Sequence, residues 1–384
     1  MMSGTRRSLL KTGAAAIVIL GAGAAAWSLT RAPTKAREPW LKAGTSFGDI
    51  RLDCLAYAIL APNPHNMQPW RVRLEGEDAL TLYCDLTRLL PETDPPNRQI
   101  TIGLGCFLEL LRQAGAERGF ALEETPFPEG EPQPLLDGRP IARVVFRHEA
   151  NIAADPLFKA ALTRRTNRAP FENRAVYQGA LADIASASVP GVIARASSDA
   201  GTVAALKALA RDAWEIEWTL DRTRRESINV TRVGKAAIDA RPWGLSLSGP
   251  LMEAAGLAGV LSPENMDAPG KSGYEQSLAF YLKAIDTAQA FLWASTATNA
   301  RLDQLAAGRA WVRMHQQASL LGVAVHPVSQ ALQEFPEMAP AYDRAHELLA
   351  HQEGATVQML ARLGYAPSPP PSPREPLEAK LVAA

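Results

Sequence analysis

The stretch from Ala61 to Trp70 reads Ala-Pro-Asn-Pro-His-Asn-Met-Gln-Pro-Trp and is the most informative segment of the chain. Its prolines fix the backbone of a turn that directly follows a predicted helix. The side chains of Asn63, Asn66 and Gln68 are left to point at a polar group, and such amides suit the hydrogen-bonding edge of a planar ring. On these residues alone, an ordinary Asn/Pro turn explains the segment at least as well.

A basic motif, Arg164-Arg165-Thr166-Asn167-Arg168, follows about a hundred residues later. Arginines bind a nearly dianionic phosphate through forked, charge-assisted hydrogen bonds, and a threonine hydroxyl can add another. The motif therefore indicates a phosphate site. The alternative is a solvated basic turn.

The first segment resembles the APSxxNxQPW segment of the nitroreductase superfamily, whose members bind FMN at the interface of a homodimer. The resemblance implies that Pro62, Asn63, Pro64 and Asn66 lie along the flavin ring and the ribityl chain. Gln68 and Trp70 are then expected to support the loop.

The basic motif is similar to the RRSxR motif with which this superfamily grips the FMN phosphate. By that similarity Arg164, Thr166 and Arg168 contact the phosphate, while Arg165 and Asn167 point elsewhere.

The two motifs occur in inverted order, because the phosphate motif usually comes first. A fused dimer that kept one complete site would hold one motif in each half, as this chain does. Gly105 and Gly119 bracket an apolar helix fourteen residues apart, and Gly308 and Gly322 bracket another at the same spacing, with the first glycine of each pair placed at the helix start. We therefore predict an α+β fold of two related halves, each a mixed or antiparallel sheet flanked by helices.

Two further segments match the superfamily. Pro327, Ser329 and Gln330, in His-Pro-Val-Ser-Gln after the second bracketed helix, stand where relatives bring a backbone amide toward flavin N5. Many nitroreductases have Glu-Gly there, so the hydride-accepting face departs from the usual pattern. Near the C-terminus, Arg374 matches the basic residue that returns to the phosphate, although a disordered proline-rich tail is the competing interpretation.

The chain divides into a signal and linker (1–40), an N-terminal half (41–155), a C-terminal half (156–366) and an extension (367–384). Apolar spacing, β-forming residues and turn signals predict the following elements. Helices are expected at 51–60, 101–118, 155–168, 203–225, 274–298 and 306–321, and strands at 70–74, 79–84, 142–146 and 323–325, with a turn at Gly76.

Residues of about 230–273 are rich in Gly, Pro and Met and show little regular pattern. Excursions this long are usually functional, often as lids. The resemblance is strongest to the Acg-like branch, whose members are fused and lidded, and some of them cover the flavin. Trp243 either covers the ring or packs in a surface core.

The N-terminus begins with Thr5-Arg6-Arg7-Ser8-Leu9-Leu10-Lys11, followed by an uncharged, largely apolar run from Thr12 to Leu29. The paired arginines resemble a bacterial twin-arginine signal, which the translocase reads. Periplasmic localisation is therefore expected. Because 18 apolar residues can just span a bilayer, a cleaved enzyme and one tethered to the inner membrane both stay open.

The composition excludes several other classes of function. The 40 basic and 40 acidic residues give no net charge, hence no footprint for nucleic acid. The three cysteines and six histidines show neither a disulfide framework nor metal-ligand spacing. No catalytic acid or base stands out in the chain.

These observations predict an exported FMN-dependent oxidoreductase that reduces a small oxidant by ping-pong chemistry, with the flavin performing the chemical step. NADH and NADPH are cytoplasmic, so another small molecule or a protein is expected to donate the electrons. The alternative is a non-catalytic protein that stores FMN beneath its lid. A fused pair needs no partner subunit, so a monomer or weak dimer is expected.

Overall fold

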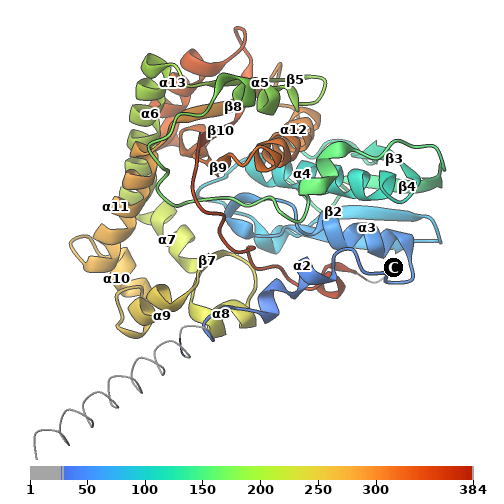
Figure 1. Cartoon of the computed structure of the whole chain (residues 1–384), viewed down its shortest axis with the longest axis horizontal. Coiled ribbons are helices and arrows are strands. Elements are labelled where there is room, and N and C mark those ends of the chain that lie inside the picture. The colour runs from blue at the N-terminus through green and yellow to red at the C-terminus, as the bar shows by residue number, and fades with distance from the viewer. Residues whose placement is uncertain (1–26, 28–29, 383–384) are drawn as a thin grey trace, which may run out of the picture.

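The computed structural model describes Trp27 and residues 30–382 (Figure 1). The expected twin-arginine motif and most of the apolar run lie outside the described residues. Within the described part, no helix is both long and apolar enough to cross a membrane.

The N-terminal half builds a four-stranded antiparallel sheet in the order β1-β2-β4-β3. The predicted hairpin around Gly76 is its β1–β2 pair. Its elements are α2 (Glu38–Lys42), α3 (Ile50–Ala58), β1 (Trp70–Glu75), β2 (Ala79–Cys84), α4 (Arg98–Ala116), β3 (Phe120–Pro126) and β4 (Ala142–His148).

The C-terminal half repeats this topology. Its sheet has the order β5-β8-β10-β9, so in each half the helix follows the second strand and the fourth strand lies between the second and third. The α+β fold of two related halves is thereby confirmed. The repeated elements are α5 (Gln178–Ser186), β5 (Val192–Ser197), β8 (Ala290–Thr296), α12 (Arg301–Leu320), β9 (Ala324–Pro327) and β10 (Thr356–Gly364).

The C-terminal half carries its additional elements between β5 and β8 and between β9 and β10. The first insertion descends along one flank of the molecule in Figure 1. It contains α6 (Ala200–Thr219), α7 (Asp221–Asn229), β6 (Thr231–Val233), α8 (Gly234–Ala240), β7 (Leu245–Leu247), α9 (Pro250–Leu257), α10 (Pro263–Asp267) and α11 (Ser272–Asp286). The second contains the short 3-10 helix η5 (Ser329–Leu332) and α13 (Ala339–Leu349).

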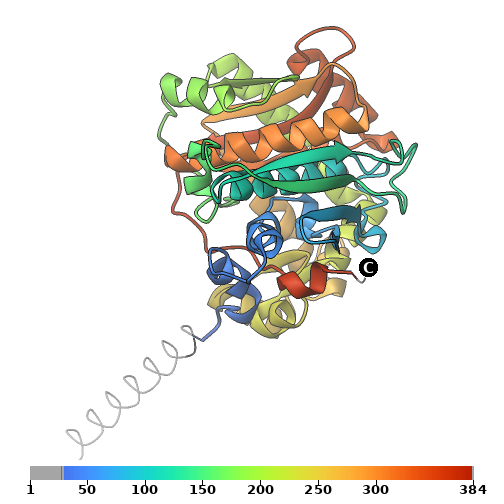
Figure 2. The ribbon, with the colours of Figure 1, turned by 90° about the vertical axis from the view of Figure 1, so that its right-hand side faces the viewer.

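The two halves meet where α4 crosses α12, and both views show this helix pair in the middle of the molecule (Figures 1 and 2). A methyl group added to Gly308 would lie 2.0 Å from the carbonyl oxygen of Ile102, and one added to Gly105 would lie 2.2 Å from that of Leu305. Only glycine allows backbones to approach this closely.

Side chains on both helices follow the same pseudo-two-fold axis. The amides of Gln113 and Gln316, 203 positions apart, donate to each other at 2.9 and 2.7 Å. The pairs Gly105/Gly308 and Ile102/Leu305 have the same spacing in the sequence. Such reciprocal contacts are those of a symmetric dimer interface, here formed within one chain.

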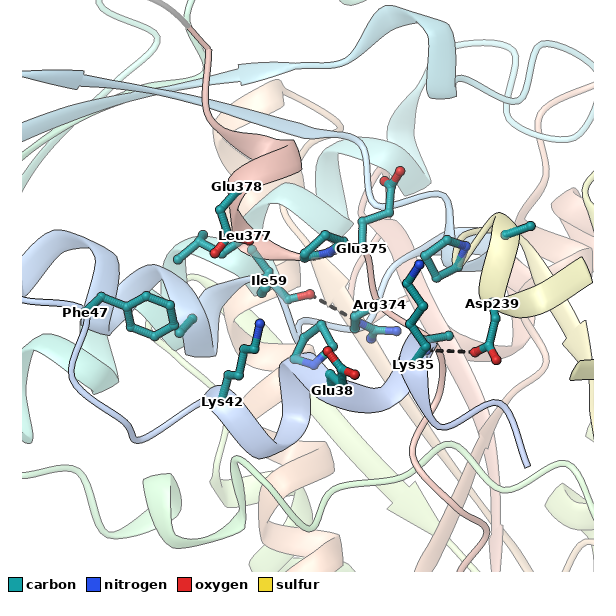
Figure 3. A pocket seen from close by; sticks show the side chains of 16 residues that line it. Lys35, Glu38, Lys42, Phe47, Ile59, Asp239, Arg374, Glu375, Leu377 and Glu378 are labelled. Atoms are coloured by element: carbon teal, nitrogen blue, oxygen red, sulfur yellow. Dashed lines mark hydrogen bonds between the residues drawn. The ribbon is translucent and has the colours of Figure 1, made fainter. Parts of the chain in front are cut away.

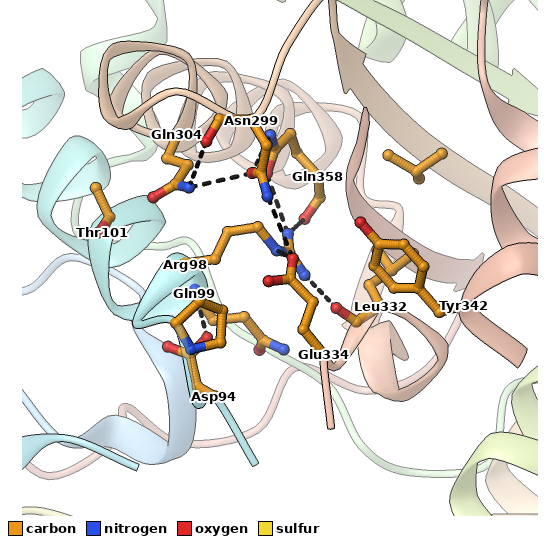
Figure 4. Close-up of polar contacts among 12 residues, drawn as sticks. Asp94, Arg98, Gln99, Thr101, Asn299, Gln304, Leu332, Glu334, Tyr342 and Gln358 are labelled. Carbon is orange, nitrogen blue, oxygen red and sulfur yellow. Dashed lines mark hydrogen bonds and ion pairs between the residues drawn. The ribbon is translucent and has the colours of Figure 1, made fainter. Parts of the chain in front are cut away.

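The first residue of each crossing helix is a buried arginine that reaches into the opposite half. Arg98 of α4 donates to the carbonyl oxygens of Gln358, at 2.9 Å, and Leu332, and pairs with Glu334 (Figure 4). Arg301 of α12 donates to the carbonyl oxygens of Pro132, Pro96 and Pro134. Each half is thus clamped to the other by a fully hydrogen-bonded cation.

Several predicted elements are wrong. The glycines Gly105 and Gly308 lie inside α4 and α12 rather than at their starts, because they serve the crossing. Residues 274–298 are not one helix: α11 ends at Asp286 and the strand β8 follows. Every residue of β8 is buried, so the strand lacks the alternation that marks a half-buried strand.

Three other predictions are also corrected. Residues 155–168 form only a short 3-10 helix (Pro156–Ala160). The helix expected at 203–225 breaks at Leu220, which has an extended backbone, and gives α6 and α7. Residues 230–273 are regular, because they form three short helices and the two-stranded parallel β6–β7 sheet.

Replacement of Gly308 by alanine should destabilise the protein. The added methyl group overlaps backbone atoms of α4, and overpacking of this kind costs about 2 kcal/mol or more, which exceeds the gain in helix propensity. Urea unfolding monitored by tryptophan fluorescence measures the effect. Gly201→Ala, also in a helix but facing only the flexible side chain of Asp199, should leave the midpoint unchanged or raise it. Equal midpoints for both variants would contradict a glycine-dependent crossing.

Candidate functional site

The segment from Ala61 to Trp70 forms a tightly held loop between α3 and β1. The side chain of Asn63 closes it, since its Oδ1 accepts the backbone N–H of Gln68 at 2.7 Å and its Nδ2 donates to the carbonyl oxygen of Ala61. His65, Asn66 and Gln68 have positive φ angles of 45°, 55° and 52°. Non-glycine residues in this region are uncommon and concentrate at functional sites.

The loop is mounted on the crossing helix of its own half. A methyl group added to Gly103 of α4 would lie 3.0 Å from Cβ of Asn63 and 3.3 Å from Cδ of Pro64. The loop therefore rests directly on the α4 backbone.

Two buried arginines converge on the carbonyl oxygens that precede the loop. Arg374 donates to those of Ile59, Leu60 and Ala61, each at 3.0 Å, and to Oδ1 of Asn66 at 2.5 Å. Arg164 donates to the same Leu60 oxygen at 3.1 Å. Residues from opposite ends of the sequence are thus brought together here, as the motifs predict.

This pair of guanidinium groups is held in an unfavourable environment. Burial lowers the pKa of Arg164 to about 10, and burial together with the charge of Arg164 lowers that of Arg374. No carboxylate within the described residues forms an ion pair with Arg164, Arg165, Arg168 or Arg374, and Nε of Arg164 has no hydrogen-bond partner there. Buried like charges of this kind are stabilised by an anion.

The opposite side of the pseudo-two-fold axis provides a comparison. His315 of α12, which lies 3.4 Å from Arg164, corresponds by the 203-residue spacing to Arg112 of α4. Glu109 and Asp155 neutralise Arg112, at 2.7 and 2.8 Å. They also neutralise the neighbouring Arg313, which contacts Glu109 at 2.8 Å and pairs with Asp155. The chain supplies carboxylates on one side of the crossing and leaves the cations on the other side unpaired.

Arg168, the last residue of the basic motif, is exposed and forms no ion pair within the described residues. Desolvation lowers its pKa. Desolvation also lowers the pKa of His65, to about 4, and that of His326, and the charge of Arg168 contributes to both shifts. Arg168, His65 and His326, from the basic motif, the first loop and β9, therefore lie near one another, and we call them the Arg168 cluster.

Tyr281 of α11 lies beside the Arg168 cluster, because its ring centre is 5.2 Å from that of His326. Its hydroxyl accepts a hydrogen bond from the Gln330 amide at 2.9 Å and donates one to the carbonyl oxygen of Pro327 at 3.4 Å. Burial raises the pKa of this tyrosine to about 12. Nδ1 of His65 and Oε1 of Gln330 are buried without a partner in the described structure, so two polar atoms near the Arg168 cluster remain unused.

The remaining predicted residues take mostly structural positions. Thr166 forms a bridge with Val325, beside the backbone bond from Asn167 to the Val325 carbonyl oxygen, and this fixes the motif along β9. The Ser329 hydroxyl donates to the carbonyl oxygen of Leu360 and accepts the Leu360 N–H, so it is fully used by β10.

Arg165 and Asn167 make contacts of their own. The Arg165 guanidinium lies 4.5 Å from the centre of the Trp40 ring, and the Asn167 amide donates to the carbonyl oxygen of Pro367. Arg165 is still near the buried pair, because Arg374 lies 5.6 Å from the same ring and the charge of Arg165 adds to the effect of burial on the pKa values of Arg164 and Arg374.

Sequence reasoning missed His65, His326, Tyr281 and Arg362. The two histidines stand inside the quoted motifs and were passed over as scattered. Arg362 is fully buried and donates to Nδ1 of His326 at 2.9 Å. Tyr281 and Arg362 stand in no recognisable sequence motif, because each comes next to His326 only through the tertiary fold.

The excursion closes over the first loop from outside. Gly244 and Asn66 exchange two hydrogen bonds, at 3.0 and 3.3 Å, and the Gln68 amide donates to the carbonyl oxygen of Pro242 at 2.7 Å. The Trp243 ring lies 3.8 Å from the Arg88 guanidinium and 4.8 Å from that of Arg232. These contacts favour the interpretation in which Trp243 packs at the surface.

A separate pocket lies on the far side of Arg374, between α2 and the C-terminal segment (Figure 3). Lys35 and Lys42 line it together with Glu38 and Glu378. Of the predicted site residues, only Arg374 borders this pocket. The mixed charge of this pocket gives no preference for an anion. The candidate site is therefore formed by Arg164 and Arg374 together with the Arg168 cluster.

Relatives of the chain were found in Mycobacterium tuberculosis. One, from strain H37Rv, carries the name "Putative NAD(P)H nitroreductase" and is 30% identical over 331 residues, which cover 84% of this chain and 88% of the relative. Another, "Putative NAD(P)H nitroreductase acg", is 34% identical over 126 residues, which cover 32% of this chain and 36% of that protein.

Solved structures were also compared. A nitroreductase structure from Anabaena variabilis ATCC 29413 has a TM-score of 0.40 at 12% identity and covers 82% of this chain and 87% of the other. A nitroreductase with bound FMN from Desulfitobacterium hafniense DCB-2 has a TM-score of 0.35 at 14% identity, covering 60% and 98%. No protein-family model matches. The mycobacterial relative aligned over most of both chains settles the assignment, and the chain belongs to the nitroreductase family.

Proposed function

We propose that the chain is an exported, FMN-dependent oxidoreductase with one flavin site built across its two halves. The single observation that carries the proposal is the pair of buried arginines, Arg164 and Arg374, that no described carboxylate neutralises. Family membership and the resemblance of both motifs to FMN-binding segments support the choice of FMN as the anion.

Arg164 fits the phosphate of this cofactor, because its Nε is unpartnered and would donate to it. The N–H groups of Arg374 are all taken by protein oxygens, so Arg374 would contribute its positive charge rather than a hydrogen bond. The Thr166 backbone position keeps the basic motif beside them. Pro62, Asn63, Pro64 and Asn66 would line the flavin ring and ribityl chain. On the same account Pro327 and Gln330 border the ring, and Ser329 contributes through its backbone because β10 uses its hydroxyl.

Bound FMN would supply the hydride and electron chemistry of the reaction. Around it, Arg168 would offset negative charge on the reduced ring, because no described carboxylate pairs with it. His65 is neutral at pH 7, with a pKa of about 4, so it can accept or donate a hydrogen bond without adding charge. Tyr281 stays protonated, with a pKa of about 12, and would donate to a small oxidant in place of its 3.4 Å hydrogen bond to the Pro327 carbonyl oxygen.

Export through the twin-arginine route gives the proposal a constraint on its substrates. A periplasmic enzyme would meet neither NADH nor NADPH, so a different donor would reduce the site and leave before the oxidant enters, in ping-pong order. Because the α4–α12 crossing supplies the interface internally, we propose that the protein works as a monomer or weak dimer.

A second candidate is FMN storage. The hydrogen bonds from the excursion to Asn66 and Gln68 favour it, because they cover the loop that would carry the flavin. In this case the excursion is a lid that stays closed.

Removal of the Arg164 charge should weaken FMN binding. Arg164→Gln eliminates a charge-assisted contact, and the expected loss in affinity is about 10- to 100-fold. Titration calorimetry with FMN provides the measurement. Arg174→Gln, which changes an exposed arginine that lies against Tyr365, is the matched control and should retain most of the affinity. If both variants bind FMN as tightly as the parent protein, the phosphate has been misplaced.

Anaerobic reduction should separate the enzyme from the storage protein. The FMN-loaded chain is mixed with dithionite, with a reduced quinone and with NADPH, and the flavin absorbance is followed by stopped flow. An enzyme should bleach within seconds with at least one physiological donor class and recover on addition of a small oxidant. Flavin that stays oxidised with every donor except dithionite would favour storage, and a protein that never takes up FMN would exclude both.

A further inference from the structure

Helix α9 (Pro250–Leu257) turns an apolar face toward solvent. None of its residues is buried, and Leu251 and Leu257 are 74% and 79% exposed. Together with Ala254 and Ala258, which are also exposed, they follow helical spacing and form one face. Contiguous exposed apolar surface of this kind usually marks an interaction site.

The opposite face of α9 holds the helix to the protein. Gly256 packs on β6, where a methyl group would lie 2.8 Å from Cγ1 of Val233. Glu253, the only charged residue of the helix, turns inward and accepts hydrogen bonds from Arg31, at 3.1 Å, and from the Lys235 backbone. The outward face is therefore left without charge.

The N-terminal segment joins the folded domain at this helix. Arg31, which pairs with Glu253, also lies 5.3 Å from the centre of the Trp27 ring, and Lys235 Nζ donates to the carbonyl oxygen of Thr30. The 18-residue apolar run of the sequence ends at Leu29, immediately before these contacts. A tryptophan beside arginine and lysine at the end of an apolar run is typical of a membrane–water boundary.

From this juxtaposition we propose that α9 docks on the surface of a lipid bilayer, next to the point at which the N-terminal run meets it. Leu251, Ala254, Leu257 and Ala258 enter the headgroup boundary. Arg31 and Lys235 contribute two positive charges here, and Glu253 is the only described carboxylate that bonds to either residue. The excess positive charge of these three residues suits anionic lipids. On this proposal α9 adds an interfacial contact beside the N-terminal run.

Docking would also orient the candidate site. Gly244, which is hydrogen-bonded to Asn66, lies six residues before Pro250 of α9 in the same excursion. In Figure 1, α9 lies at the end of the molecule where the described chain begins, and α13 lies at the opposite end. A bilayer at α9 would therefore face the excursion and leave the C-terminal sheet in water.

Site-specific labelling tests the proposal without requiring FMN, so its failure and that of the proposed function are distinguishable. The three native cysteines are buried, so a new thiol reacts selectively with a nitrobenzoxadiazole dye. Leu257→Cys reports on α9, and Leu348→Cys on α13 is the control. The full-length protein is reconstituted into vesicles of equal parts phosphatidylethanolamine and phosphatidylglycerol that carry a headgroup nitroxide quencher.

The expected result is several-fold stronger quenching at position 257 than at position 348, with a blue-shifted emission that needs vesicles. Equal quenching at both positions would overturn the proposal. A blue shift that is already complete without vesicles would also overturn it, since the N-terminal run or a second copy would then cover the helix.

A second variant guards against local effects of the dye. With the label at Ala254→Cys, the double change Leu251→Glu plus Leu257→Glu should reduce quenching to the control level. The melting temperature should stay unchanged because both side chains are exposed. Full quenching in this variant would contradict docking through the apolar face.

Discussion

The backbone contact between α4 and α12 at Gly105 and Gly308 is the constraint on which the other features depend. It brings the two helices close enough for Gln113 and Gln316 to bond to each other, and Arg98 and Arg301 then reach across in opposite directions. A homodimer would form this interface by association. Here it is intramolecular, so the relative position of the two halves is independent of concentration.

The same pair of helices positions the candidate site. The loop of Asn63 and Pro64 rests on Gly103 of α4, and His315 of α12 contacts Arg164. Arg164 of the basic motif and Arg374 of the C-terminal extension are thereby both placed within hydrogen-bonding distance of the Leu60 carbonyl oxygen, next to the loop. The inverted order of the two motifs along the chain has no effect on this geometry.

The symmetry of the backbone is broken by charge. Glu109 and Asp155 neutralise Arg112 and Arg313 on one side, whereas Arg164 and Arg374 have no such partners on the other. A buried cation without a carboxylate partner is costly, although Arg301 shows that carbonyl oxygens can satisfy one. Arg164 differs from Arg301 because its Nε has no partner in the described structure, and this unused donor suits the proposed anion. On this account the fold has two symmetry-related sides, and only the side of Arg164 and Arg374 binds an anion.

The sequence allowed prediction of what is encoded locally. The Asn63–Asn66 loop, the basic motif and Arg374 were identified from local motifs that resemble those of the nitroreductase superfamily, and the α+β fold of two halves followed from the inverted order of these motifs. Fully buried strands such as β8 and β10 have no alternation and were missed or taken for helix. Tyr281 and Arg362 come next to His326 through long-range packing. The close approach that explains Gly105 and Gly308 depends on a partner helix some 200 residues away in the sequence.

The most direct test of the central claim compares FMN with riboflavin, which lacks only the phosphate. If the phosphate lies at Arg164 and Arg374, FMN should bind with a stoichiometry of one per chain and about 100-fold more tightly than riboflavin, as a charge-assisted contact to Arg164 and the positive charge of Arg374 imply. Equal affinities for the two ligands, or two FMN molecules per chain, would contradict a single phosphate site at these arginines.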